Sequence, residues 1–178
     1  MGPMQTTDRL ILRRPTAADV ESVFAIYGDP ATNVFNPFGP HANLEKSREV
    51  LDGWIAHWAA RGFGQWAIST RQAADAVIGF GGVAYRKYLE TNALNLGYRL
   101  AATAWGQGYA TEVAQAALSH ALDELHEPEV FAIVRPSNAP SIRVLEKIGM
   151  KRIGTLDDVP GQAPSYLYGA KQKEAHAD

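Results

Sequence analysis

Apolar and polar residues alternate along this chain with two different periods, which predicts both strands and helices. The first alternating run, residues 9–13, stops before a proline and is typical of a strand near a sheet edge. Thr16 is followed three residues later by Asp19, a capping-box spacing that predicts a helix ending at Gly28. Residues 44–61 place apolar side chains at helical spacing opposite charged ones, so a second, amphipathic helix is expected there.

Strand-forming residues dominate the middle of the chain. Residues 65–70 and 76–87 flank a short turn at 72–75, so they are expected to form a β-hairpin, and residues 94–100 form the next strand. Glycines inside the second strand of this hairpin indicate a β-bulge or a close backbone contact. These glycines are Gly79, Gly81 and Gly82.

Helices and strands alternate in the last third of the chain. Helices are expected over residues 111–126 and 139–148, and strands over 130–134, 150–155 and 166–170. The resulting order of elements predicts an α+β fold, a three-layer α/β arrangement in which a mixed central sheet carries helices on both faces.

Composition and size are those of a single globular domain. The chain has 178 residues, of which 46% are hydrophobic and 20% charged. A chain of this length buries about 70% of its surface on folding, which is enough for one core. We expect one domain over residues 9–170, followed by a tail at 171–178. Residues 1–8 are expected to be an N-terminal extension, which begins like an expression-tag remnant or an alternative start.

Several partners and chemistries are excluded by composition. Lys and Arg number 17 and Asp and Glu 19, a net charge of -2, so neither a nucleic acid nor a membrane is expected as a partner. The absence of cysteine excludes disulfides, thiolate metal sites and a cysteine nucleophile, and five scattered histidines give no reason to expect a metal. No apolar run approaches the about 20 residues that cross a bilayer, and no signal-peptide pattern opens the chain. A cytoplasmic monomer or homodimer is therefore expected.

The first segment that carries chemistry is 105–112, Trp-Gly-Gln-Gly-Tyr-Ala-Thr-Glu, which links a predicted strand to a predicted helix. Gly106 and Gly108 let the backbone turn tightly and approach a ligand, and the first amides of the helix are free donors at the positive end of its dipole. This pattern predicts an anion site, most naturally for a pyrophosphate. One alternative is that the glycines only make a tight connection. Another is a dinucleotide fold, whose fingerprint lacks its third glycine here because Thr111 occupies that position.

A second polar cluster follows the predicted strand at 130–134. Asn138 closes a loop before a short helix, and Ser141, one turn into that helix, faces the same way. Together the two segments resemble the GNAT acetyltransferase superfamily, in particular its RimJ/RimL-like branch. The correspondence covers nearly the whole chain, from residues 9–13 through Gly-Phe-Gly-Gly at 79–82 to Tyr-Leu-Tyr-Gly at 166–169.

The resemblance implies a sheet that splays open between the fourth and fifth expected strands, with the pantetheine arm of acetyl-CoA in the gap. Backbone groups near Tyr98 and Leu100 would pair with the pantetheine amides, and Asn138 would bond the arm. The pyrophosphate would lie on the glycine loop and the first helical turn. The loop residues concerned are Trp105, Gly106, Gln107, Gly108, Tyr109, Ala110 and Thr111.

Side chains on the helix after Asn138 complete the expected site. Arg143 would either reach a phosphate or be a surface cation. Leu145 stands where many members of the superfamily carry a tyrosine that protonates the leaving thiolate. Ser141 is the remaining nearby hydroxyl, so Ser141 and Asn138 are the expected catalytic side chains as well as contacts of the coenzyme.

The general base is not assigned by the sequence. Asn95 stands where this branch commonly carries a carboxylate, which leaves Glu90, His41 or a chain of water molecules as alternatives. The acceptor is expected to enter opposite CoA, over a set of aromatic side chains whose other interpretation is simple core packing. This set is Phe35, Phe38, Trp66 and Tyr85.

The activity implied is acetyl transfer from acetyl-CoA to a primary amine, carried either by a small molecule or by a protein or peptide N-terminus. Direct attack in a ternary complex is expected, because no cysteine is present to form an acyl-enzyme. Two other classes stay open: a non-catalytic acyl-CoA-binding module and a dinucleotide-dependent oxidoreductase.

Overall fold

The computed structural model describes residues 4–173, which form one eight-stranded mixed sheet in the order β1-β2-β3-β4-β5-β6-β8-β7. The strands are β1 (Met4–Thr6), β2 (Leu10–Arg13), β3 (Gln65–Thr70), β4 (Ala73–Tyr88), β5 (Thr91–Leu100), β6 (Glu129–Val134), β7 (Lys151–Leu156) and β8 (Ser165–Lys171). The helices are α1 (Val20–Tyr27), α2 (Leu44–Arg61), α3 (Tyr109–Ser119) and α4 (Ala139–Lys147), with short helical turns η1 (Ala17–Asp19), η2 (Pro30–Asn33), η3 (Ala102–Ala104) and η4 (His120–Glu124). The α+β fold and the mixed sheet expected from the sequence are confirmed.

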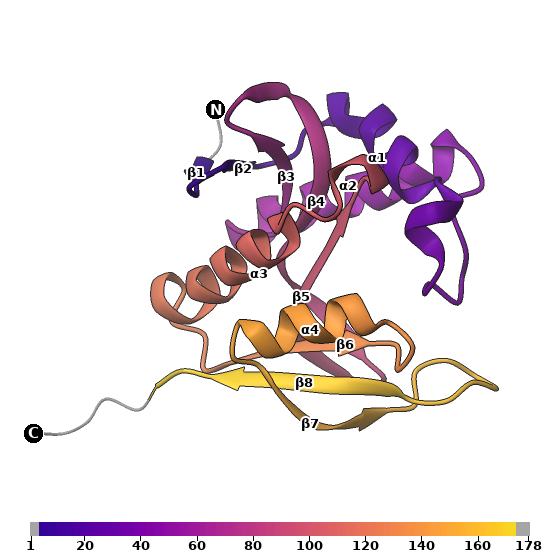
Figure 1. Cartoon of the computed structure of the whole chain (residues 1–178), viewed down its shortest axis with the longest axis vertical. Helices are drawn as coiled ribbons and strands as arrows, with labels where there is room; N and C mark the ends of the chain where they lie inside the picture. Colours follow the sequence, from indigo (N-terminus) through magenta and orange to yellow (C-terminus); the bar gives the residue numbers. More distant parts are fainter. Residues whose placement is uncertain (1–3, 174–178) are drawn as a thin grey trace, which may run out of the picture.

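The sheet has two halves joined through β5. In Figure 1, β1 to β4 with α1 and α2 form the upper half, and β6 to β8 with α4 form the lower half. β5 pairs with β4 in antiparallel register from Thr91 to Leu100, but it pairs with β6 at one position, Asn95 with Phe131. Beyond Asn95 the two strands no longer pair, so the splay lies between the strands where the resemblance implied it.

Two apolar clusters hold the layers together. The larger cluster packs β5 and β6 against α3 and α4, with Leu96, Val113 and Leu145 among its buried members. The smaller one packs α1 and α2 against the opposite face of β3 and β4, around Val23 and Phe80. Both faces of the sheet are therefore covered.

Glycines in β4 allow β5 to carry large side chains. A Cβ atom at Gly79 would lie 2.5 Å from Cδ2 of Leu100, and one at Gly81 would lie 2.7 Å from Cβ of Tyr98. The expected close contact is confirmed, because real Cβ atoms do not approach other atoms so closely. The bulge lies in the β3–β4 ladder, where the register shifts on both sides of Ser69.

The start of α1 is fixed by a partly buried ion pair. Nη2 of Arg13 lies 2.7 Å from Oδ1 of Asp19, and Oδ2 of Asp19 accepts the backbone N–H of Thr16 at 2.8 Å. Burial alone would raise the pKa of Asp19, but the hydrogen bonds from Arg13 and Thr16 outweigh it and lower the pKa. The capping residues read from the sequence thus anchor α1, and with it the loop that follows, to β2.

Several expected boundaries differ from the structure. Met4–Thr6 pair with β2, Met4 opposite Arg13, so the domain includes part of the segment expected to be an extension. This pairing satisfies backbone groups that β2 would otherwise expose at the sheet edge. β4 begins at Ala73, whose N–H donates to Oγ1 of Thr70, so the hairpin turn is tighter than the expected 72–75. β8 reaches Lys171, whereas residues 1–3 of the expected extension and 174–178 of the expected tail lie outside the described residues.

Candidate active site

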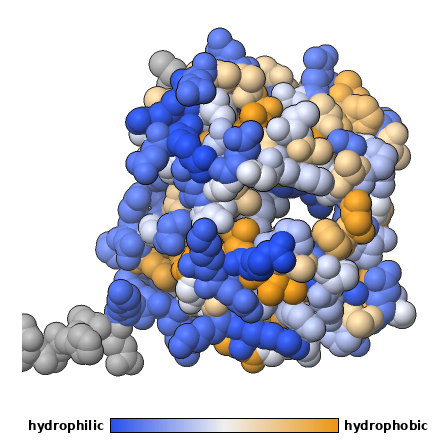
Figure 2. Space-filling view, viewed as in Figure 1, coloured by the Kyte–Doolittle hydropathy of each residue, from blue (hydrophilic) through white to orange (hydrophobic). Residues whose placement is uncertain are grey.

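A cavity of about 890 Å³ opens where β5 and β6 part. Its walls come from β5, the end of β6, α4, the glycine loop before α3, and the loop that follows η2. Figure 2 shows the hollow between the upper and lower halves of the molecule. The cavity therefore joins the expected coenzyme side of the fold to the expected acceptor side.

Most residues expected to contact the coenzyme line this cavity. They are Tyr98, Leu100, Trp105, Gly106, Gly108, Tyr109, Ala110, Thr111, Asn138 and Ser141. Leu145 also forms part of the wall, at the position where many members of the superfamily carry a tyrosine. Two residues that were expected to contact the coenzyme, Gln107 and Arg143, do not line the cavity. The carbonyl of Gln107 accepts a hydrogen bond from Arg9, and Arg143 lies exposed on α4.

The glycine loop has the geometry of an anion site. Gly106 and Gly108 have φ angles of 75° and 79°, a left-handed conformation that favours glycine. Gly108 is the N-cap of α3, and no side chain of the described residues caps this helix. The first amides of α3, from Tyr109 to Thr111, are thus left as donors at the wall of the cavity.

Arg9 ties this loop to the sheet, a role that the sequence did not reveal. Its Nη1 donates to the carbonyl of Gln107 at 2.7 Å, its Nε lies 3.0 Å from Oε1 of Glu112, and its guanidinium lies over the ring of Tyr109. Glu112 also accepts the hydroxyl of Thr7 at 2.7 Å. Burial would raise the pKa of Glu112, but the bonds from Thr7 and Arg9 lower it, so the carboxylate stays charged.

A pair of hydroxyls spans the gap between β5 and α4. Oη of Tyr98 lies 3.2 Å from Oγ of Ser141. The backbone N–H of Ser141 donates to Oδ1 of Asn138 at 3.3 Å, so Asn138 is the N-cap of α4 and keeps its Nδ2 for a ligand. Burial raises the pKa of Tyr98, which keeps the phenol protonated at neutral pH. Sequence reasoning found Ser141 but missed the hydroxyl of Tyr98.

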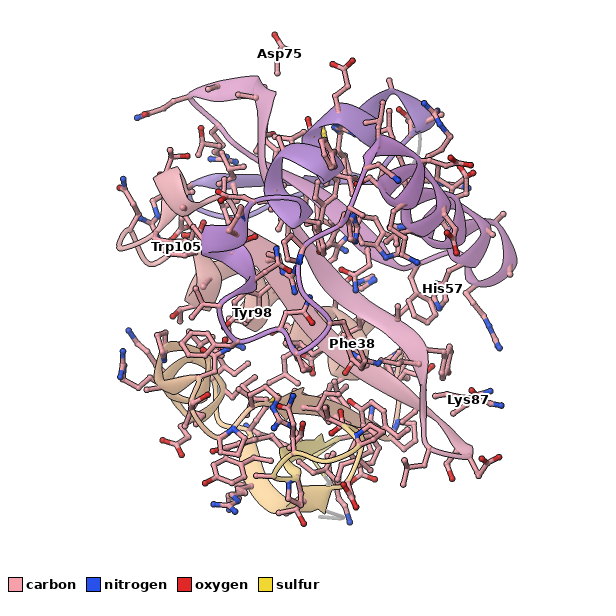
Figure 3. All side chains as sticks on the ribbon, turned by 90° about the vertical axis from the view of Figure 1, so that its right-hand side faces the viewer. Phe38, His57, Asp75, Lys87, Tyr98 and Trp105 are labelled. Atoms are coloured by element: carbon pink, nitrogen blue, oxygen red, sulfur yellow. The ribbon has the colours of Figure 1, made fainter. Side chains whose placement is uncertain are left out.

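Two of the four aromatic side chains expected in the acceptor pocket line the cavity. Phe35 and Phe38 line the cavity from the loop after η2, and in Figure 3 this loop passes in front of β5. Trp66 is 1% exposed and packs against His120 in the larger core cluster, so its assignment to the pocket was wrong. Tyr85 was also wrongly assigned: it donates to Oε1 of Glu127 at 2.8 Å, away from the cavity wall. Trp66 is a core residue, and Tyr85 packs half-buried against the larger core cluster.

The two side chains considered as alternatives for the general base, His41 and Glu90, lie outside the cavity wall. His41 stacks on Tyr27 and hydrogen-bonds Ser47, and Glu90 is exposed in the β4–β5 turn; neither lines the cavity. Asn95 does line it, and its Oδ1 accepts the hydroxyl of Tyr88 at 2.5 Å.

Asp158, in the loop between β7 and β8, is the one acidic side chain among the described residues that line the cavity. It was missed because no motif surrounds it. Its Oδ1 is buried and has no hydrogen-bond partner in the described part of the chain. Across residues 4–173 no cluster of His, Asp and Glu is placed to hold a metal ion, and no helix is long and apolar enough to span a bilayer.

Comparisons with known proteins agree with this geometry. Residues 9–151 match the family model described as "Acetyltransferase (GNAT) domain". The uncharacterized N-acetyltransferase YoaA of Bacillus subtilis is 27% identical over 158 residues, which cover 88% of this chain and 87% of that protein. The crystal structure of an acetyltransferase from Agrobacterium tumefaciens superposes with a TM-score of 0.80 and 26% identity, over 97% of this chain and 96% of that one.

A more distant structure shares the fold. It is RimL, a ribosomal L7/L12 alpha-N-protein acetyltransferase in complex with coenzyme A, with a TM-score of 0.74 and 16% identity over 96% of this chain and 98% of that one.

The Arg9 contacts lead to a testable prediction. Arg9→Gln should raise the Kd for coenzyme A by about tenfold or more, because bonds to a charged group are lost and the loop is freed. Binding of S-acetylpantetheine, which lacks the pyrophosphate, should be unchanged. Isothermal titration with both ligands measures this, with the exposed Arg71→Gln as the matched control. An equal loss for both ligands, or none for coenzyme A in a folded variant, would contradict the positioning role.

Proposed function

Since the chain belongs to the GNAT acetyltransferase family, we propose that it transfers the acetyl group of acetyl-CoA to a primary amine by direct attack in a ternary complex. The observation that carries this proposal is the cavity at the splay between β5 and β6. It connects a loop with free amides on one side to the aromatic loop after η2 on the other. Two ligands can therefore meet in one continuous space.

The coenzyme half offers three kinds of contact. Free amides at the start of α3 suit the pyrophosphate, and Nδ2 of Asn138 suits a carbonyl of the pantetheine arm. The backbone of β5 beyond Asn95 has no strand partner on the β6 side, so its polar groups can pair with the amides of the arm. When bound, acetyl-CoA supplies a thioester as the acyl donor.

The transfer makes one bond and breaks another. The amine nitrogen forms a bond to the acetyl carbon, and the carbon–sulfur bond breaks. The thiolate takes a proton from the hydroxyl pair of Tyr98 and Ser141, which faces the gap, and the pair regains a proton from solvent. The proton released by the amine passes to Asp158 or to solvent at the cavity mouth. Backbone amides of β5 that face the gap polarise the thioester carbonyl.

The acceptor is proposed to be an amine of low pKa, such as a peptide α-amine. Attack requires the neutral amine, and Asn95 cannot remove a proton. At pH 7 an α-amine of pKa about 7.7 to 8.0 is roughly a tenth neutral, whereas a lysine side chain of pKa about 10.4 is neutral in about one molecule in 2,500. The difference of about 2.5 pKa units corresponds to about 3.4 kcal/mol.

The proposed function is tested by acetyl-CoA-dependent thiol release. A peptide with a free N-terminus and no lysine is compared with its N-acetylated counterpart that contains one lysine, between pH 6.5 and 9. We expect a higher kcat/KM for the free N-terminus at pH 7 and a gain for the lysine peptide as pH rises. Equal rates at pH 7 would mean that a strong buried base exists. Binding of acetyl-CoA without turnover of any amine would contradict acetyl transfer itself.

The hydroxyl pair gives a second prediction. Tyr98→Phe and Ser141→Ala should each lower kcat by about 10²-fold or more while leaving the KM for acetyl-CoA nearly unchanged, because they remove an acid and not a binding contact. The double variant should be little worse than the more damaged single one, since the two hydroxyls act as a unit. Steady-state kinetics of the four proteins measures this. A loss below about threefold in both single variants would return the pair to a packing role.

A further inference from the structure

Arg99 faces the acceptor side of the cavity. Successive side chains of β5 point to opposite faces, so Arg99 lies on the face away from Tyr98 and α4. Its Nη1 donates to Oδ1 of Asn33 at 2.8 Å, and its guanidinium lies 4.6 Å from the ring centre of Tyr27. Arg99 lines the cavity together with the residues that follow Asn33, including Phe35.

The neighbours of Arg99 are all uncharged at neutral pH. Asn33 is an amide. Burial raises the pKa of Tyr27 to about 12, although Arg99 acts in the opposite direction. His41 stacks on Tyr27, and burial together with the charges of Arg99 and Lys46 lowers its pKa, so it is neutral at pH 7. The charge of the guanidinium is therefore not balanced by any of the groups around it.

Comparison with two other arginines sharpens this point. Arg9 is paired with Glu112 and Arg13 with Asp19, both at hydrogen-bond distance. None of the ion pairs formed among residues 4–173 includes Arg99. A partly buried guanidinium without a carboxylate gains more from an arriving anion than an exposed one, because solvent screens it less. Its Nη2 and Nε are not engaged by the described residues and can form a forked pair with a carboxylate.

The distribution of charge over the cavity wall also favours an anion beside Arg99. Arg86, Arg99 and Arg135 line it, against Asp158 as the acidic residue. Burial raises the pKa of Tyr88, and the nearby charge of Asp158 acts in the same direction. Since the hydroxyl of Tyr88 donates to Asn95, Asp158 lies toward the end of the cavity where β5 and β6 still pair. Along β5, Arg99 lies four residues or about 13 Å beyond Asn95. The guanidinium of Arg99 is thus well separated from the acidic residue of the cavity wall, and an anion bound there would not meet that carboxylate.

We propose that Arg99 binds an anionic group of the acceptor, and that the natural acceptor is an amine that also carries a carboxylate. This proposal rests on the proposed acetyl transfer and narrows its substrate class. Such an acceptor is either a free amino acid or a peptide with an acidic side chain near its N-terminus. Arg99 acts on binding and discrimination, and the hydroxyl pair on the other face of β5 acts on the leaving group.

Matched acceptors test the proposal. We would compare Ala-Glu-amide with Ala-Gln-amide, and L-alanine with L-alaninamide, by thiol release under saturating acetyl-CoA. In the unmodified protein kcat/KM should favour the acid of at least one pair by about tenfold or more, mainly through KM. The pair that shows the preference identifies the source of the carboxylate, peptide or free amino acid. Equal kcat/KM within both pairs would overturn the anion site while leaving acetyl transfer intact, and no reaction with any amine would mean that the proposed function fails.

Variants at position 99 show whether this residue is responsible. Arg99→Gln should abolish the preference for the acid, and Arg99→Lys should restore part of it. The ratio of two acceptors measured on one preparation does not depend on how much of the protein is folded. Arg48→Gln, on the exposed face of α2, is the control and should keep the preference. If Arg99→Gln keeps the preference, or instead raises the KM for acetyl-CoA alone, the assignment of Arg99 to the acceptor is wrong.

Discussion

One backbone constraint organises the molecule: β5 is paired along its whole length on one side and at a single residue on the other. The ladder with β4 runs from Thr91 to Leu100, while the contact with β6 is the pair Asn95 and Phe131. A strand whose polar groups remain unpaired inside a fold requires another partner. The cavity at this edge supplies the space for one. The site is therefore a consequence of how the sheet is built, not a feature added to its surface.

Two arginines, Arg9 just before β2 and Arg13 at its end, hold the two sides of this cavity. Arg9 fixes the glycine loop through Gln107 and Glu112, and Arg13 fixes the start of α1 through Asp19. Since α1 leads into η2 and the aromatic loop, these two arginines brace the proposed coenzyme side and the proposed acceptor side at once. Binding energy on either side can then serve positioning, because neither loop has to be ordered first.

Features carried by short stretches of sequence were predictable, and features made by distant residues were not. The glycine loop and the cap at Asn138 depend on the local conformational preferences of glycine and asparagine, so they can be predicted from the residue types alone. The bond from Arg9 to Gln107 joins residues 98 positions apart, and that from Arg99 to Asn33 joins residues 66 apart. No spacing rule indicates such partners. Trp66 and Tyr85 were misassigned for a related reason: aromatic character does not tell which face of a strand a side chain occupies.

The most direct test of this account is amide hydrogen exchange with and without acetyl-CoA. If the unpaired edge of β5 is the binding surface, acetyl-CoA should slow exchange in residues 97–100 and 106–111 and leave the β2–β3 ladder unchanged, and NADH should do neither. Protection that spares β5 and the glycine loop, or equal protection by NADH, would contradict the assignment of the splayed sheet to the coenzyme.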